Sequence, residues 1–284
     1  MSAAQSGLTV RSIAARLEAV GIERTAARRE ARLLISHFTG VTEARLLTSP
    51  DEEFESEELS RAVEAREGRY PLQYILGTWD FYGLSFKVNE STLVPRPDTE
   101  VIVEAAIAAC PRGGRILDLC TGTGCIAAAI LANVADTRCV AVDLYEDTLD
   151  VARENIERLG LSERCELICG DATTELFPKG ELFDVIVSNP PYITVGEMRE
   201  LEPELSFEPE AALTDGGDGL SILSAMLGIY KSHLTETGVM LVEHGWRQSE
   251  AVLSIADSNG LSATPLRDYS GNTRGCRLRS PEVA

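Results

Sequence analysis

The spacing of apolar side chains divides this 284-residue chain into stretches of different character. In residues 1–78 apolar positions recur every three or four residues, which predicts helices at about 9–20, 25–38, 43–47 and 57–67. These stripes are best explained as the core of a small helical bundle. No candidate catalytic residue stands among them.

Aromatic residues cluster at the start of the next stretch, residues 79–100, at Trp79, Phe81, Tyr82 and Phe86. They alternate with small residues around Gly83, a pattern typical of a β-hairpin. We therefore interpret residues 79–100 as a hairpin and linker between a helical domain at 1–78 and a larger domain at 101–284.

The linker ends in Pro95-Arg96-Pro97-Asp98-Thr99-Glu100. Its two prolines predict a rigid turn, because each fixes its own backbone φ. Asp98 and Thr99 are residue types that cap helices, so either is placed to cap a helix predicted over 101–109.

From Arg115 onward, short apolar strands alternate with amphipathic helices, which indicates an α/β domain with a parallel sheet and crossover helices. The predicted strands are 116–119, 139–142, 166–169, 184–188 and 239–243, and the helices are 124–132, 147–159, 219–234 and 250–258. Two last strands, 266–268 and 276–279, are predicted to pair as a hairpin across 269–274.

The strand at 184–188 stops on Asn189-Pro190-Pro191-Tyr192. Two prolines remove two backbone donors, so the sheet cannot continue and a stiff elbow is expected at the carboxyl end of a strand, where α/β sheets bind ligands. The Asn189 side-chain oxygen and the Pro190 carbonyl are two acceptors that can hold both hydrogens of a planar NH₂ group. Tyr192 supplies a flat wall beside them. The elbow, including Pro191, is thus the predicted catalytic and substrate-binding segment for an amide, adenine, cytosine or guanine.

A second candidate site follows the strand at 116–119, in Asp118-Leu119-Cys120-Thr121-Gly122-Thr123-Gly124. Glycines there let the backbone approach a ligand closely. The spacing Gly122-x-Gly124-x-x-Ala127 formally matches a dinucleotide fingerprint, but such a match alone is weak. We favour S-adenosylmethionine (AdoMet) because Asp118 can attract its ammonium group.

Three further residues complete the predicted site, of which Asp171 and Asn189 favour AdoMet. Asp143 ends the second strand, where an acid can grip ribose hydroxyls. Asp171 ends the third strand, where it can accept from an adenine amino group. Asn189 follows the strand at 184–188, so the elbow is expected at the same carboxyl edge of the sheet as Asp143 and Asp171. The cofactor-binding set predicted from the residues is Asp118, Cys120, Thr121, Gly122, Thr123, Gly124, Asp143 and Asp171, and the family resemblance described below implies that Asn189 also contacts the cofactor.

Composition limits the classes of binding partner that we expect for this chain. The net charge of −19, with only three lysines, leaves no basic footprint for stable nucleic-acid binding. An acidic surface suits a basic protein partner, or serves solubility alone. The seven cysteines include no Cys-x-x-Cys, which fits a reducing compartment, and the three histidines are too far apart to indicate a metal site. No apolar run of about 18 residues and no signal peptide is found, so we expect a cytoplasmic protein without a membrane span.

The chain resembles the release-factor glutamine methyltransferases, the HemK/PrmC family, over nearly its whole length. Asn-Pro-Pro-Tyr alone is shared with DNA adenine and RNA guanine methyltransferases, but its combination with Arg96-Pro-Asp-Thr-Glu100 is highly specific. The motifs that carry the resemblance are Arg69-x-Pro71-x-Gln73-Tyr74-Ile75-x-Gly77, Pro95–Glu100, the Asp118 loop, Asn189–Tyr192, Glu208-Pro-Glu-Ala-Ala-Leu213 and the closing Asp268-Tyr269-Ser270-Gly271-Asn272.

The resemblance implies a seven-stranded, Rossmann-like class I AdoMet methyltransferase domain, preceded by a helical domain that helps dock the substrate. It implies methylation of the glutamine N5 in the Gly-Gly-Gln motif of class I peptide chain release factors, with S-adenosylhomocysteine as product. Asn189 and Pro190 would hold the glutamine amide and Tyr192 would pack on it. A monomer is expected.

Two positions depart from the family pattern. Cys120 stands where the loop's first glycine is usual, which tightens the space near the cofactor. Ala172, also in the predicted cofactor site, stands where some members carry an aromatic residue. The alternatives are a glutamine methyltransferase of a ribosomal protein, a nucleic-acid amino-methyltransferase, and a non-catalytic binding protein that kept the fold.

Overall fold

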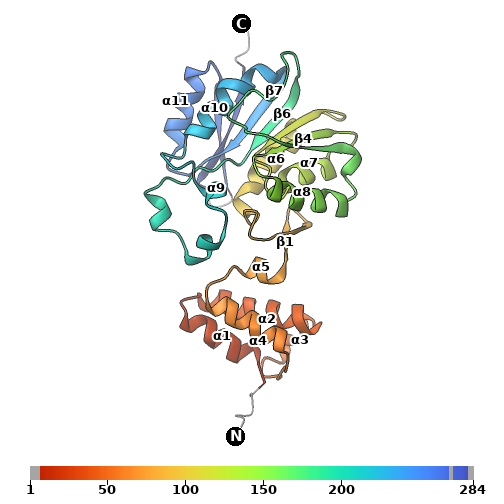
Figure 1. Ribbon diagram of the computed structural model, residues 1–284, viewed down its shortest axis with the longest axis vertical. Coiled ribbons are helices and arrows are strands. Elements are labelled where there is room, and N and C mark those ends of the chain that lie inside the picture. The colour runs from red at the N-terminus through yellow and green to blue at the C-terminus, as the bar shows by residue number, and fades with distance from the viewer. Residues whose placement is uncertain (1–6, 269–270, 281–284) are drawn as a thin grey trace. The chain divides into compact units, whose positions relative to one another are not determined.

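The computed structural model describes residues 7–268 and 271–280 and divides into two compact units (Figure 1). The helical unit comprises Met1–Gly77 together with Glu202–Phe207, and the sheet unit comprises Thr78–Leu201 together with Glu208–Ala284. Tyr269 and Ser270 of the predicted closing turn lie outside the described residues.

In residues 7–77, the described part of its first segment, the helical unit holds five α-helices. Four correspond to the predicted ones and confirm them. Thr9 caps the first through a reciprocal bond with Ser12, and Gly40 ends the second in the left-handed conformation. A fifth, five-residue helix after Pro71 was not predicted, because it is too short to show a periodicity. The bounds are α1 Val10–Ala19, α2 Arg24–Thr39, α3 Glu43–Thr48, α4 Glu57–Glu67 and α5 Leu72–Leu76.

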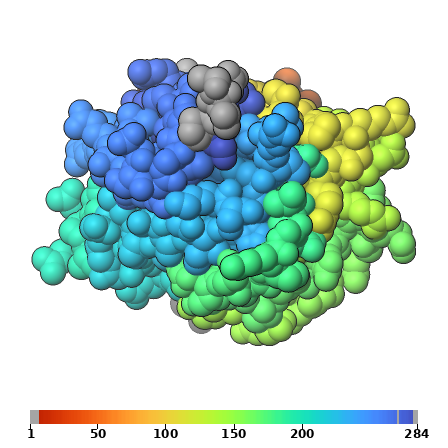
Figure 2. Space-filling model, turned by 90° about the horizontal axis from the view of Figure 1, so that it is seen from above, coloured from red at the N-terminus to blue at the C-terminus, as the bar shows by residue number. Residues whose placement is uncertain are grey.

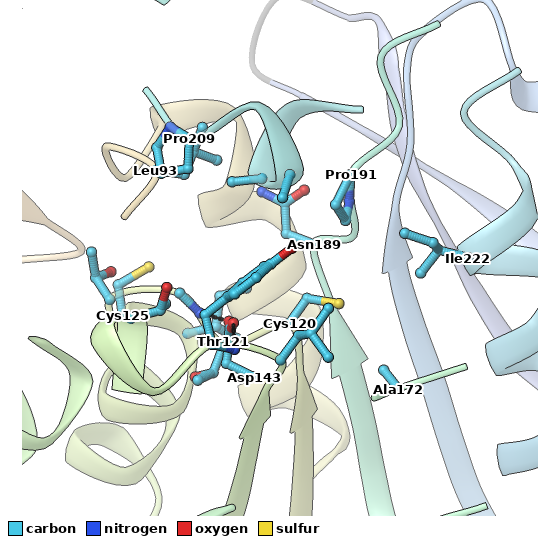
Figure 3. Close-up of a pocket in the computed structure, with 18 of the residues that line it drawn as sticks. Leu93, Cys120, Thr121, Cys125, Asp143, Ala172, Asn189, Pro191, Pro209 and Ile222 are labelled. Carbon is cyan, nitrogen blue, oxygen red and sulfur yellow. Dashed lines mark hydrogen bonds between the residues drawn. The ribbon is translucent and has the colours of Figure 1, made fainter. Parts of the chain in front are cut away.

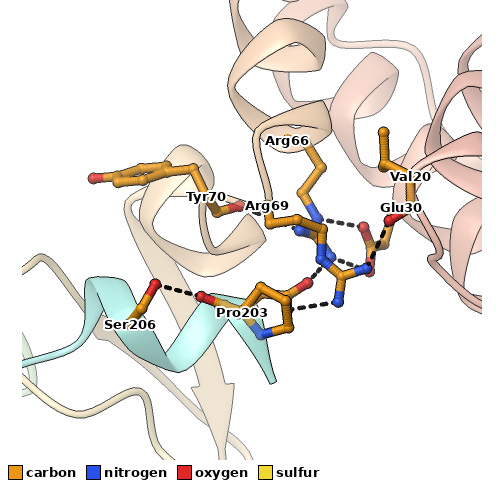
Figure 4. Close-up of polar contacts among 8 residues, drawn as sticks. Val20, Glu30, Arg66, Arg69, Tyr70, Pro203 and Ser206 are labelled. Atoms are coloured by element: carbon orange, nitrogen blue, oxygen red, sulfur yellow. Dashed lines mark hydrogen bonds and ion pairs between the residues drawn. The ribbon is translucent and has the colours of Figure 1, made fainter. Parts of the chain in front are cut away.

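The segment Glu202–Phe207 joins the helical unit although it lies far along the chain. Glu204, in the short 3₁₀ helix Pro203–Phe207, pairs with Arg66 at 2.8 Å and with Arg69 at 2.7 Å. Figure 4 shows both arginines reaching toward this 3₁₀ helix. Phe207 packs edge-on against Tyr70, with ring centroids 5.3 Å apart. From its position in the chain alone, this segment is expected in the domain at 101–284. Ion pairs between residues so far apart in sequence leave no periodic pattern from which they could be predicted.

The sheet unit contains a seven-stranded sheet in the order β5-β4-β3-β6-β7-β9-β8. The first five strands in this order, β5, β4, β3, β6 and β7, pair in parallel. Strand β9 pairs antiparallel with both β7 and β8, and its pairing with β8 is the predicted terminal hairpin. A separate hairpin of β1 Thr78–Phe81 and β2 Leu84–Lys87 precedes it, also as predicted. The sheet strands are β3 Arg115–Leu119, β4 Arg138–Asp143, β5 Cys165–Cys169, β6 Phe183–Ser188, β7 Leu234–Glu243, β8 Ser262–Arg267 and β9 Thr273–Arg279.

Helices cover both faces of this sheet, so its central strands are apolar on both sides (Figure 1). Val185 and Val187 of β6 face one core, with α6 Glu100–Ala109, α7 Cys125–Asn133 and α8 Glu146–Arg158. Ile186 faces the other core, with α10 Ser221–Tyr230 and α11 Ser249–Ser258. Seen from above in Figure 2, the blue C-terminal segment and the yellow-to-green segment of α6–α8 form opposite flanks. This arrangement confirms the predicted fold class.

One predicted boundary was wrong. The helix expected over 219–234 ends at Tyr230, continues as a 3₁₀ turn and gives way to β7 already at Leu234. Polar residues at 235–237 hid the first half of that strand from the apolar pattern. Its pairing with β6 is irregular there, and Gly238 permits it because a side chain would meet the Phe183 carbonyl at 3.0 Å.

No helix in residues 7–268 and 271–280 is both long enough and apolar enough to cross a membrane.

Candidate active site

A cavity of about 280 Å³ lies at the carboxyl ends of β3, β4 and β6 (Figure 3). This is the edge at which parallel α/β sheets bind ligands. Its walls come from segments far apart in the chain: 93–99, 120–126, 143–148, 170–173, 189–191 and 209–222. Both motifs predicted from sequence, the loop after β3 and the elbow after β6, therefore meet in one place.

The loop after β3 is braced from inside by Asp118, which is fully buried. Its Oδ2 accepts a bond from the Thr121 hydroxyl at 2.7 Å and from the Ala127 amide at 3.2 Å, while Oδ1 has no partner among the described residues. Burial raises the pKa of Asp118 to about 7. Asp118 does not line the cavity, so a contact with a cofactor ammonium stays a prediction.

The loop's backbone needs left-handed conformations at three positions. Gly122 and Gly124 adopt them without cost, at φ +58° and +77°. Cys120 adopts φ +59° despite its side chain, a conformation that glycine would adopt without strain. Burial raises the pKa of the Cys120 thiol to about 12, so a neutral thiol lines the cavity.

The two acids predicted to bind the cofactor both line the cavity. Asp143 accepts bonds from the amides of Gly122, at 2.9 Å, and Tyr145, at 3.3 Å, and burial raises its pKa. Asp171 uses one oxygen, Oδ1, to accept from the amide and hydroxyl of Thr173. Both carboxylates retain acceptor capacity for a ligand's hydroxyl or amino groups. Ala172 is also part of the wall and leaves no ring to stack there.

The elbow is held by three side chains from two distant segments, the turn before α6 and the end of β7 with the residues after it. The Asn189 amide nitrogen donates to the Thr99 hydroxyl at 3.3 Å. The Tyr192 hydroxyl donates to Glu243 Oε1 at 3.0 Å, and the Tyr192 carbonyl accepts from Gln248 at 2.9 Å. Asn189 and Pro191 line the cavity, whereas Pro190 and Tyr192 lie outside its described lining.

The turn at residues 96–100 is tied to separate parts of the sheet unit. Arg96 forms an ion pair with Glu208, whose carboxylate also accepts from the Val94 amide at 3.1 Å. Asp98 forms an ion pair with Arg274 at 2.9 Å. Thr99 accepts a hydrogen bond from Asn189, and Glu100 accepts one from the Tyr82 amide at 3.2 Å. The turn at residues 96–100 thus links the elbow, the hairpin, the segment around Glu208 and the end of the sheet near Arg274.

The helix-capping role predicted for Thr99 was wrong. Thr99 occupies the N-cap position of α6 but makes no side-chain cap bond, because its hydroxyl faces Asn189 instead. The sequence also gave no role to Glu243 or Gln248. The only signal for Glu243 was its place at the carboxyl end of β7, level with the other site residues.

Comparisons with known proteins agree with this geometry. The family model described as the PrmC N-terminal domain matches residues 9–77, and the methyltransferase small domain matches residues 97–242. A release factor glutamine methyltransferase of Neisseria gonorrhoeae is 39% identical over 249 residues, covering 86% of this chain and 90% of that protein. The chain belongs to the release factor glutamine methyltransferase family.

A second member of this family, from Cereibacter sphaeroides, is 38% identical over 277 residues and covers 96% of this chain and 97% of that protein. A solved methyltransferase of Pyrococcus furiosus shares the fold, with a TM-score of 0.52 at 20% identity over 70% of this chain and 89% of that one. The family resemblance read from the sequence is confirmed, and the protein is a methyltransferase.

Among the described residues, no group of three or more His, Cys, Asp or Glu side chains could hold a metal ion.

Proposed function

We propose that this protein transfers a methyl group from AdoMet to the side-chain N5 of the glutamine in the Gly-Gly-Gln motif of class I peptide chain release factors. Membership in the family supports this reaction. The observation that carries it in this chain is the orientation of Asn189, whose nitrogen is engaged by Thr99 at 3.3 Å, which leaves its oxygen available to accept from a substrate NH₂ group.

The cavity fits the proposed cofactor. The acceptor capacity of Asp143 suits ribose hydroxyls, and that of Asp171 suits an exocyclic amino group. Cys120, Thr121, Gly122 and Thr123 form the wall between them. Bound AdoMet supplies an electrophilic methyl group and leaves as S-adenosylhomocysteine.

The elbow would orient the substrate amide. The Asn189 oxygen and the Pro190 carbonyl accept the two N–H hydrogens, so that the nitrogen's remaining direction faces the methyl group. A nitrogen–carbon bond forms as the sulfur–carbon bond breaks, and the methylated nitrogen then loses a proton to water. The protein's contribution is chiefly to position the amide and to exclude competing water. We place Tyr192 as a wall behind the elbow.

The surface charge fits the proposed partner. A net charge of −19 complements a basic, RNA-facing protein and would speed the encounter at low salt. We assign docking of the release factor to the helical domain at residues 1–78.

A labelling experiment tests the proposal. Radiolabelled AdoMet is incubated with the protein and a release factor, either wild type or carrying Gln→Ala in its Gly-Gly-Gln motif. Only the wild-type factor should be labelled. Asn189→Ala should lower the rate by about 10²–10³-fold, the usual effect of removing one group that positions a reacting atom. Asn89→Ala, at an exposed loop asparagine, is the matched control and should keep full activity. Equal labelling of both factors would overturn the proposal.

A further inference from the structure

The orientation of an asparagine side chain decides whether it offers an acceptor or a donor. With its nitrogen on Thr99, at 3.3 Å, Asn189 presents its oxygen elsewhere. A half-turn about the last side-chain bond would exchange the two ends and present an NH₂ group to the substrate's own NH₂. Two donors cannot bond each other, so a group that prevents the half-turn would matter for the reaction.

The Thr99 hydroxyl is the neighbour that meets Asn189, and it carries one hydrogen. Thr99 is 2% exposed, so its side chain is almost entirely shielded from bulk solvent. Among the described residues no standard hydrogen bond leads from this hydroxyl to an acceptor, and it does not cap α6. If the hydrogen pointed at Asn189, the amide would have to turn its oxygen toward Thr99.

Glu243 offers the missing acceptor. Its carboxyl is 1% exposed; Oε1 accepts from the Tyr192 hydroxyl at 3.0 Å, and Oε2 has no hydrogen-bond partner among the described residues. Thr99 is nevertheless near enough that its hydroxyl lowers the pKa of Glu243 against the rise caused by burial. Thr99 meets Asn189 at one end of the four-residue elbow, and Glu243, with its unpartnered Oε2, meets Tyr192 at the other end.

We propose that Glu243 is a positioning residue, whose carboxylate draws the Thr99 hydrogen to itself and so fixes the amide orientation of Asn189. A carboxylate accepts only, so Thr99 must donate to it. The Thr99 oxygen can then only accept from Asn189, and the Asn189 oxygen faces the substrate. The same carboxylate fixes the Tyr192 hydroxyl. This inference rests on the proposed function of Asn189.

Protonation of Glu243 would release this constraint, because the added hydrogen makes the carboxyl a donor as well. The pKa of Glu243 is raised to about 7, chiefly by burial. The groups that face it pull both ways: the hydroxyls of Thr99 and Tyr192 and the charge of Arg274 lower the pKa, and the charge of Asp98 raises it. Activity should therefore fall as the pH drops through about 7.

The test compares kcat and KM for the release factor between about pH 6 and about pH 8.5. Thr99→Val removes the hydroxyl at equal volume and should lower kcat about tenfold or more, whereas Thr99→Ser should restore most of it. Glu243→Gln should lower kcat and abolish the acid limb of the profile. Matched controls are Glu236→Gln and Thr237→Val, both exposed on β7, which should behave as wild type.

For each variant, AdoMet affinity is measured by calorimetry and stability by thermal unfolding. We expect each variant to fold and to bind AdoMet within about twofold of the wild-type affinity. This result would separate a loss of substrate positioning from a collapse of the whole site. A wild-type kcat in Thr99→Val, or an acid limb that persists in Glu243→Gln, would overturn it. Failure of the wild-type protein to label the release factor at any pH would instead overturn the proposed function.

Discussion

The two sides of the cavity are stabilised in different ways. The loop after β3 has an internal brace, because Asp118 bonds Thr121 and Ala127, three and nine positions away. Its other side-chain partners, Asp143 and Asn155, lie 21 and 32 positions from the loop residues they contact. The elbow after β6 is held by Thr99 and Glu243, 90 and 51 positions from the residues they contact. The cofactor side therefore combines a brace of its own with bonds to the next strand and helix, whereas the substrate side depends on more distant parts of the sheet unit.

This contrast predicts that substitutions far from the elbow in sequence can disable transfer while leaving cofactor binding intact. Changes around Asp118 should do the reverse, disturbing the loop and sparing the elbow.

Gly219→Ala should damage the elbow most. At φ +75° a Cβ on Gly219 would lie 2.0 Å from the Tyr192 carbonyl oxygen, so strain and overlap together should lower the free energy of unfolding by about 4 kcal/mol. Transfer should fall at least about 100-fold as the elbow shifts. Chemical denaturation and the labelling assay measure both effects.

Gly216→Ala is the matched control, because it has the same conformation, at φ +76°, but nothing within 4 Å of the added carbon. It should cost only about 1 kcal/mol. Equal losses in the two variants would show that the close approach to Tyr192 does not matter.

Asp118→Asn should change how stability depends on pH. The folded pKa of about 7 exceeds the ordinary value of 3.8, so the folded state binds more protons between them. The stability that Asp118 contributes is full below about pH 4 and is lost as the pH rises through about 7. The variant should therefore gain relative to wild type toward pH 8, by on the order of 3 kcal/mol. Denaturation at several pH values tests this, with the exposed Asp80→Asn as control. A constant difference across pH would contradict it.

Asp143→Asn should weaken the cofactor side without touching the elbow. An amide can keep the bond to the Gly122 amide but loses a charge and an acceptor for ribose hydroxyls. We expect the Kd for AdoMet to rise about tenfold, which corresponds to about 1.4 kcal/mol. Calorimetry against Asp147→Asn, an exposed acid on α8, measures the difference. An unchanged Kd would remove Asp143 from the cofactor site.

Glu204→Gln should have the smallest effect and concerns the helical unit. Glu204 pairs with Arg66, whose side chain is 5% exposed and keeps its second partner, Glu30, at 2.7 Å. Loss of one charge should therefore cost about 1 kcal/mol. Glu57→Gln breaks a 4.0 Å pair of exposed side chains and should cost almost nothing in the same unfolding experiment. Similar values for both would mean that Glu204 does not secure residues 202–207.

The same contrast explains what sequence could predict. The loop around Gly122 and the elbow at Asn189 were visible because local chemistry defines them: glycines at a tight turn, and two prolines that end a strand. Alternating strands and helices likewise predicted the sheet. The partners of the elbow could not be predicted, since nothing in the local sequence links Thr99 with Glu243. Thr99 was misread as a helix cap because its position before α6 is the place where caps occur.

Tandem mass spectrometry of the release-factor peptide that contains Gly-Gly-Gln tests the central claim most directly. After incubation with AdoMet and the wild-type protein, the fragment series should place one added methyl group on the glutamine side chain. The Asn189→Ala protein should leave that peptide unmodified in the same time. A methyl group on any other residue, or equal modification by both proteins, would contradict the account.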